Sequence, residues 1–163
     1  MTQKYQIRLA LREDLDRIME IYDIARQFMR REGNATQWSG GYPQRELLEA
    51  DIVRRKLFVV TSGERIRGVF YFSMGPDPTY GRIEDGDWHF DAPYGVIHRI
   101  ASDGSGGIFP AAMEFCLTHC SYLRIDTHHD NLPMQHVVQK NGFRRCGIIF
   151  LPDGSPRIAY DRI

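Results

Sequence analysis

The sequence predicts an α+β fold: one domain over residues 1–163, in which helices flank a mixed β-sheet. Three observations lead to this prediction. The length of 163 residues is that of one domain, and no repeat, linker or low-complexity tract divides it. Strand and helix patterns follow one another in the order β-α-α-β-β-β-α-β-α-β-β. A strand-helix-strand run near the middle implies one parallel crossover in an otherwise antiparallel sheet.

The first elements follow from local periodicity. Residues 5–10 alternate weakly between polar and apolar side chains and predict a strand. Residues 12–33 place apolar side chains at helical spacing, and Gly33 and Asn34 end this helix. Pro43 suits the first turn of a second helix, which extends roughly over residues 43–56.

Strand patterns then dominate. Residues 57–62 and 65–73 flank Gly63-Glu64, a hairpin turn. An irregular segment rich in acidic and aromatic residues follows, RIEDGDWHFDAP at residues 82–93. The remaining patterns predict a strand, a helix, a strand, a helix and two closing strands, at residues 94–101, 106–120, 122–128, 131–141, 143–150 and 157–163.

Composition narrows the class of protein. Lys plus Arg and Asp plus Glu both total 21, so no net charge favours binding to nucleic acid or to a membrane. The sequence has no apolar run of membrane-spanning length, and its first ten residues carry no signal-peptide core. Three cysteines, an odd number, argue against a disulfide framework. We therefore expect a cytoplasmic protein, as a monomer or a homodimer.

A glycine-rich turn is the most informative local feature. It lies within RIASDGSGGIFPAAMEFC at residues 99–116, between a strand and a helix, and contains Gly104, Gly106 and Gly107. Its spacing fits neither the Walker loop nor the dinucleotide fingerprint. Backbone N–H groups at a helix start can hold an anion. Glycines also permit a tight reversal without any ligand, so both interpretations remain open on the turn alone.

Taken with residues 122–143, YLRIDTHHDNLPMQHVVQKNGF, this turn resembles the GNAT superfamily of acetyl-CoA-dependent N-acetyltransferases. The resemblance covers Ile7 to Tyr160 in element order. Its most telling parts are residues 97–101 leading into the turn, Asn131 followed by Met134, and Lys140-Asn141-Gly142-Phe143. The segment TQWSGGYP at residues 36–43 is also similar to the acceptor-side loop of some bacterial members.

The resemblance implies a fold detail and a cofactor. The strand ending near Ala101 would splay away from the strand ending near Thr127, with the pantetheine arm in the gap. The turn and the following helix would hold the pyrophosphate of acetyl-CoA, the co-substrate. The residues implied to bind it are Ile100, Ala101, Ser105, Gly106, Gly107, Ile108 and Asn131.

The sequence departs from the family pattern at three positions. Gly104 stands where the family's loop has Arg or Gln, and Phe109 stands where it has Gly or Ala. Val138 aligns with the tyrosine that commonly protonates the leaving thiolate. Backbone N–H groups from Ser105 to Ile108 can still donate to a phosphate, whereas Pro110 cannot.

Two residues are candidates for catalysis. His98 lies mid-strand beside the implied thioester position, and it could take a proton from an ammonium acceptor. The alternative is a hydrogen-bonded structural histidine. Asp126 and His128 end the partner strand and could orient one another; the alternatives are a helix cap or a solvated strand end. We expect Arg99 and Arg124 on the outer sheet face as ordinary ion-pair partners.

Acidic and aromatic side chains are candidates for binding an amine, through ion pairing and cation–π contact. These substrate-binding candidates are Trp38, Tyr42, Glu84, Trp88 and Tyr94. The alternatives are that Trp38 and Tyr42 pin their loop to the sheet and that residues 82–93 form a solvated loop.

We expect no metal. Cys116 and Cys120 lie one helical turn apart with His119 beside them, but no CxxC spacing accompanies them. Buried cysteines commonly act as small apolar side chains.

The resulting prediction is an N-acetyltransferase. It would move an acetyl group from acetyl-CoA to a primary amine of a small molecule or peptide, by direct attack in a ternary complex. The alternative is a catalytically idle acyl-CoA binding or sensing module of the same fold, which Phe109 and Val138 favour.

Overall fold

One seven-stranded sheet runs through residues 5–163, the part of the chain that this computed structural model describes. Its strands lie in the order β1-β2-β3-β4-β5-β7-β6. The strands are β1 Gln6–Leu9, β2 Leu57–Ser62, β3 Arg65–Met74, β4 Gly95–Ser102, β5 Leu123–Thr127, β6 Arg144–Phe150 and β7 Pro156–Arg162. The helices are α1 Leu15–Arg31, α2 Arg45–Val53, α3 Ile108–Leu117 and α4 Leu132–Lys140, with short 3₁₀ turns at Arg12–Asp14 and Pro78–Tyr80.

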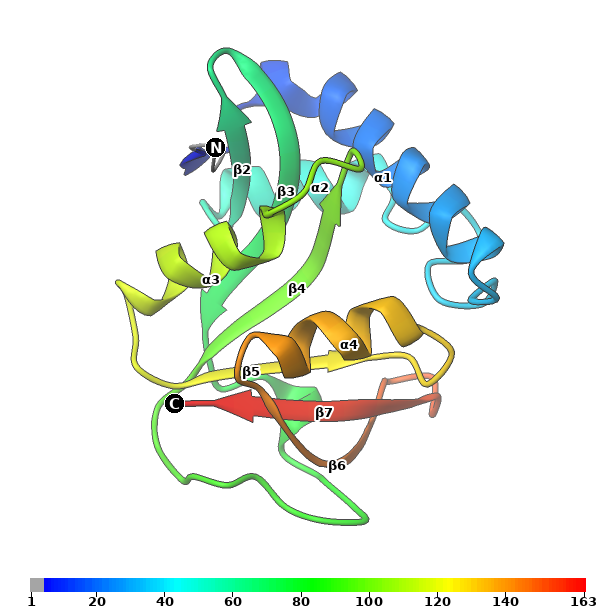
Figure 1. Cartoon of the computed structure of the whole chain (residues 1–163), viewed down its shortest axis with the longest axis vertical. Helices are drawn as coiled ribbons and strands as arrows, with labels where there is room; N and C mark the ends of the chain where they lie inside the picture. Colours follow the sequence, from blue (N-terminus) through cyan, green and yellow to red (C-terminus); the bar gives the residue numbers. More distant parts are fainter. Residues whose placement is uncertain (1–4) are drawn as a thin grey trace.

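The predicted α+β fold class and element order are confirmed. β4 and β5 pair in parallel, and the other neighbouring strands described pair antiparallel. Because successive side chains of a strand point to opposite faces, Val59 and Val60 belong to different cores. Helices α1 and α2 pack on the face of Val59, and α3 and α4 pack on the face of Val60 (Figure 1).

The feature that positions the site is the splay between β4 and β5. The two strands pair only at Gly95↔Leu123 and Val96↔Arg124, and beyond these pairs they diverge (Figure 1). Gly95 permits the close start, since a Cβ there would lie 2.7 Å from both Cys120 Sγ and Phe72.

A bulge in β4 accompanies the divergence. Arg99 has a φ of 51°, in the left-handed region, and the register against β3 shifts between Val69 and Tyr71. The hydroxyl of Tyr22 in α1 donates to the Arg99 carbonyl oxygen at 2.7 Å and holds the bulge. The carboxyl-terminal ends of β4 and β5 therefore do not pair with each other, and they border an open gap.

The segment at residues 82–93 lies against β6 at the far edge of the sheet. Glu84 and Ile148 form a two-residue bridge, and Trp88 packs against a third cluster of buried residues around Tyr80 and Ile149. No helix within residues 5–163 has the length and apolar character needed to cross a membrane.

Candidate active site

Two cavities border the gap between β4 and β5. One has a volume of about 580 Å³ and is lined by residues 36–39, the end of β4, β5 and the β6–β7 turn; we call it the polar cavity. The other has a volume of about 720 Å³ and is lined by α1, the end of β4, the glycine turn, the first turn of α3 and one side of α4 along its length; we call it the glycine-turn cavity. Both are lined by Met29, Ile100, Asn131 and Met134. A group bound in one cavity can therefore meet a group bound in the other.

The Asp103 carboxylate organises the start of the glycine turn. Asp103 accepts hydrogen bonds from the backbone N–H of Ser105 at 3.0 Å and from its hydroxyl at 2.6 Å. Arg17 and Arg67 form ion pairs with the same carboxylate, at 2.9 and 3.2 Å. Burial raises the pKa of Asp103, but the Ser105 and Arg67 hydrogen bonds outweigh it and lower the pKa below the ordinary value. The turn is thus organised without a ligand.

Four consecutive N–H groups of the turn remain available for an anion. Ser105 is not among them, because Asp103 occupies its N–H. The N–H groups of Gly106, Gly107, Ile108 and Phe109 donate to no acceptor within residues 5–163. Gly107, with a φ of 80°, precedes the first residue of α3, so the positive end of the helix dipole lies here.

Two cationic side chains, Arg31 and Lys140, line the same cavity, and in the described chain neither forms an ion pair. Phe109 is buried, and its ring packs edge-on against Phe143 with 6.2 Å between ring centres. Its side chain therefore joins the core, and the backbone of the turn keeps its donors. These residues together fit a phosphate-bearing ligand.

The residues between the cavities come from β4 and the start of α4. Ile100 lines both cavities and Ala101 lines the glycine-turn cavity. Asn131 caps α4, because its side-chain oxygen accepts from the Met134 N–H at 3.1 Å. Its amide nitrogen donates to Gln37 at 3.0 Å, which ties the loop at residues 36–39 to α4.

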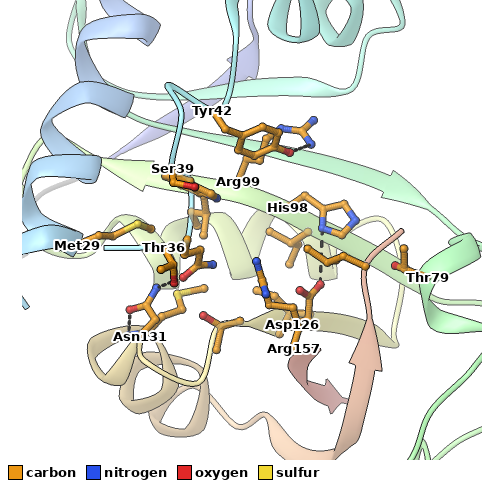
Figure 2. A pocket seen from close by; sticks show the side chains of 18 of the residues that line it. Met29, Thr36, Ser39, Tyr42, Thr79, His98, Arg99, Asp126, Asn131 and Arg157 are labelled. Atoms are coloured by element: carbon orange, nitrogen blue, oxygen red, sulfur yellow. Dashed lines mark hydrogen bonds and ion pairs between the residues drawn. The ribbon is translucent and has the colours of Figure 1, made fainter. Parts of the chain in front are cut away.

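His98 in the polar cavity lies between two carboxylates. Its Nε2 is 2.8 Å from Asp77 Oδ2, and its Nδ1 is 3.9 Å from Asp126 Oδ1. Asp126 also accepts a hydrogen bond from the Tyr80 hydroxyl at 2.7 Å. Figure 2 shows His98 and Asp126 on one side of the cavity, opposite Met29, Thr36 and Asn131.

Asp77 orients this histidine and was not predicted from the sequence. Desolvation raises the pKa of Asp77, but hydrogen bonds from His98 and Thr79 outweigh it and lower the pKa to about 2. The backbone N–H of Asp77 donates to the Tyr94 hydroxyl at 2.9 Å. The carboxylate is therefore ionised at neutral pH and holds one ring nitrogen of His98. The arrangement can move a proton in the polar cavity.

Two arginines, Arg99 and Arg157, line the polar cavity. Arg99 forms an ion pair with Asp51 and donates to the Tyr42 hydroxyl at 3.3 Å. Its guanidinium lies 4.8 Å from the ring centre of Tyr71. Arg157 in β7 also lines the cavity and was not predicted as a site residue.

The expectation that Arg99 and Arg124 lie on the outer sheet face is wrong, although Arg99 does form an ion pair, with Asp51. The Arg99 side chain is only 11% exposed. Arg124 is buried over the rings of Trp88 and Tyr94, at 4.2 and 4.0 Å from their centres. Asp51 and Tyr42 contact Arg99, and the rings of Trp88 and Tyr94 cover Arg124; local sequence patterns do not show these long-range contacts.

The predicted substrate-binding residues divide into two groups. Trp38 and Tyr42 line the polar cavity, and Tyr94 lies directly behind Asp77. Glu84 and Trp88 line neither cavity. Glu84 is exposed and pairs with Arg82, and the Trp88 indole N–H donates to the Tyr80 carbonyl at 3.1 Å.

Possible metal ligands gather at two places in the described residues, outside the predicted cysteine pair. His89, Cys146 and Asp161 form one group, and His128, His129 and Asp130 form the other. In the first group Asp161 already accepts from His89 and from the Tyr122 hydroxyl. In the second His128 contacts Thr36 and accepts from the Asp130 N–H. Cys116 is buried in the core, as expected of a packing residue.

No protein-family model matches the chain, and no curated protein matches it. An acetyltransferase of the GNAT family from Streptococcus agalactiae is 31% identical, covers 99% of this chain and 96% of its own, and has a TM-score of 0.90. Ard1 from Thermoplasma volcanium is 18% identical, with 98% and 97% covered and a TM-score of 0.66. A GNAT-family acetyltransferase from Listeria monocytogenes is 20% identical, with 97% and 94% covered and a TM-score of 0.64. The last two show likeness of fold alone.

Proposed function

Since the chain belongs to the GNAT family of acetyltransferases, we propose that it moves an acetyl group from acetyl-CoA to a primary amine of a small molecule or peptide. The observation that carries the proposal is the meeting of the two cavities in the strand gap, with His98 on one side and four available N–H groups on the other. Attack would be direct, while both substrates are bound. Positioning the two reactants side by side supplies most of such a rate.

The glycine-turn cavity would hold the coenzyme. Its pyrophosphate would accept hydrogen bonds from the N–H groups of Gly106 to Phe109, and Arg31 and Lys140 would add charge. The pantetheine arm would lie between β4 and β5, where the missing ladder leaves backbone groups to pair with its amides. N–H groups near Ile100 and Ala101 would polarise the acetyl carbonyl.

The polar cavity would hold the acceptor. At neutral pH a primary amine exists mainly as its ammonium form, which must lose a proton before the nitrogen can attack. His98, oriented by Asp77, would take that proton, directly or through water. The neutral amine then attacks the acetyl carbonyl carbon and forms the C–N bond. When the tetrahedral adduct collapses, the C–S bond breaks, coenzyme A leaves as the thiolate, and the nitrogen releases its remaining extra proton to the thiolate or to water.

The second candidate function is an idle acyl-CoA binding module. It is favoured by Val138, which aligns with the family's usual acid and is fully buried in the core.

Thermal-shift measurements with CoA, acetyl-CoA and a panel of amines separate the two candidates when followed by a thiol-release assay. An enzyme shows stabilisation by CoA and amine-dependent thiol release, and the release survives exhaustive chelation. Stabilisation by CoA with no thiol release for any amine would favour the module. Loss of activity to chelator, restored by zinc, would contradict metal independence.

A further inference from the structure

Arg157 lines the polar cavity and has hydrogen-bond donors that no acceptor of residues 5–163 occupies. It lies in β7 opposite Ile149 of β6, and its side chain lines the polar cavity. Its Nη1 donates to the Pro156 carbonyl at 2.8 Å and to the Ser155 hydroxyl at 3.4 Å. Its Nε and Nη2 have no acceptor within residues 5–163. Two of its nitrogens can therefore bind a ligand.

The charge of Arg157 is only partly balanced. No carboxylate of the described chain lies within ion-pair distance of it, whereas Arg99 is paired directly with Asp51. Asp126 and Asp153 act on Arg157 from farther away, and each accepts hydrogen bonds elsewhere, from Tyr80 and from Ser155. Burial lowers the pKa of Arg157, an effect that these two acids only partly offset. A partly buried guanidinium without a close counter-ion favours an anionic ligand.

Negatively charged side chains lie beside His98, in the same cavity as Arg157. Asp77 and Asp126 flank this histidine, and Asp77 is ionised at neutral pH. His98, Asp126 and Arg157 lie on the same side of the cavity in Figure 2. A ligand that carries both an ammonium and an anionic group can therefore pair with the carboxylates beside His98 and with Arg157 at the same time.

We propose that the acceptor is an amino acid or a similar amine that bears a carboxylate, and that Arg157 binds the carboxylate through Nε and Nη2. The ammonium then lies toward Asp77, Asp126 and His98, where it loses its proton. The fork of a guanidinium matches the two oxygens of a carboxylate. This inference deepens the proposed function and rests on it for the chemical step, but the binding it describes can be tested separately.

The experiment compares acids with their own amides. Common L-amino acids and the matching amino-acid amides are assayed as acceptors with wild type, Arg157→Gln and Arg82→Gln. Arg82 is the control, because its side chain is 71% exposed and pairs with Glu84 outside both cavities. We expect wild type to prefer the acids. Arg157→Gln raises KM for the acids by roughly 10- to 100-fold, the effect of a lost charge-assisted hydrogen bond, and leaves kcat and the amides unchanged. Arg82→Gln matches wild type.

Three results would overturn the inference: a wild-type preference for amides, equal efficiency on both members of each pair, or an equal loss on both in Arg157→Gln. If no amine is acetylated, titration calorimetry of the same pairs onto the CoA-saturated protein decides the matter. Binding of acids that Arg157→Gln abolishes supports the inference while the proposed function fails. Binding that ignores the carboxylate, or no binding, rejects the inference.

Discussion

The glycine-turn cavity and the polar cavity meet at Ile100 and Met134, yet they are built from different parts of the chain. The first presents backbone N–H groups from four consecutive residues, Gly106 to Phe109, and only two cationic side chains, Arg31 and Lys140, line it beside them. The groups of the second come from seven separate segments of the chain, and they include the side chains of Trp38, Asp77, His98 and Arg157. A site made of backbone depends on conformation, whereas a site made of side chains depends on identity.

This difference explains what the two cavities tolerate. Gly104 and Phe109 replace residues that the family usually has in its loop, but the N–H groups of the turn are still presented. In the polar cavity a single substitution removes the functional side chain itself. Substitutions of side chains should therefore have their largest effects in the polar cavity, and substitutions that change φ should have theirs in the glycine turn.

The largest expected effect is that of His98→Gln. We expect kcat/KM for any accepted amine to fall by about 10²- to 10⁴-fold, because the acceptor loses its base. The affinity for CoA should not change, since His98 lines only the polar cavity. Steady-state kinetics and CoA titration measure the two quantities.

The matched control is His119→Gln. His119 follows the C-terminal end of α3, contacts Phe115 and Thr118 there, and lines neither cavity, so its loss should leave kcat/KM unchanged. If His98→Gln retains full activity, His98 is a structural residue and the polar cavity does not supply a base.

The second effect tests the backbone cavity. Gly107→Pro removes an N–H group and forces a φ near −65°, whereas Gly107 has a φ of 80°. We expect CoA affinity, measured by titration calorimetry, to fall by at least roughly tenfold. Gly107→Ala is the control at the same position, because it strains the same φ but keeps the N–H.

The proline variant should therefore bind CoA much more weakly than the alanine variant. Equal affinities in the two variants would mean that the N–H of Gly107 contributes nothing beyond conformation, and the pyrophosphate site would have to lie elsewhere.

The contrast between the cavities also decides how much could be predicted from the sequence. Element order and fold class follow from periodicity, and the turn follows from three closely spaced glycines. The bulge in β4 could not be predicted, because its left-handed residue is Arg99, where sequence rules favour glycine. It forms because the Tyr22 hydroxyl, far away in sequence, holds its carbonyl.

The polar cavity was predicted only in part, for a similar reason. Asp77 lies between two prolines in a loop, and no periodicity marks it as a partner of His98. Glu84 and Trp88 form a local cluster of acid and aromatic residues, but the bridge to Ile148 holds their segment against β6. Local composition cannot tell which side of a sheet a loop will cover.

A smaller effect concerns Asp77 and pH. Its pKa of about 2 in the folded chain lies below the ordinary value of 3.8, since hydrogen bonds from His98 and Thr79 outweigh desolvation. A lowered pKa stabilises the fold above the unfolded-state pKa, and this contribution is lost as pH falls through the folded-state value. We expect Asp77→Asn to be less stable than wild type at neutral pH, with the difference shrinking between about pH 4 and pH 2.

Urea unfolding at several pH values measures this difference. Asp16→Asn is the control, because the Asp16 side chain is 92% exposed. It should show little loss of stability at neutral pH. A constant difference between Asp77→Asn and wild type down to pH 2 would mean that the Asp77 charge does not stabilise the fold.

The smallest expected effect concerns the missing acid. The thiol of coenzyme A should have a pKa near that of a cysteine, about 8.5, so the thiolate can leave without a proton. Val138 is fully buried, and Tyr80, Tyr122 and Tyr160 are buried too. Within residues 5–163, Tyr42 is the only tyrosine that lines either cavity. Its hydroxyl accepts from Arg99 at 3.3 Å, so it is the one phenol that could replace the usual acid.

We expect Tyr42→Phe to change kcat by less than about threefold, the loss of one weak hydrogen bond. The pH profile of kcat/KM should rise through one limb, because only deprotonation of the ammonium or of His98 limits it, and it should show no alkaline decline. The measurement is a pH–rate profile of wild type and Tyr42→Phe on the same amine, with folding checked at each pH. If the wild-type profile is a bell whose alkaline limb disappears in Tyr42→Phe, the tyrosine donates the proton. The polar cavity would then supply both base and acid, and a mechanism without an acid would be wrong.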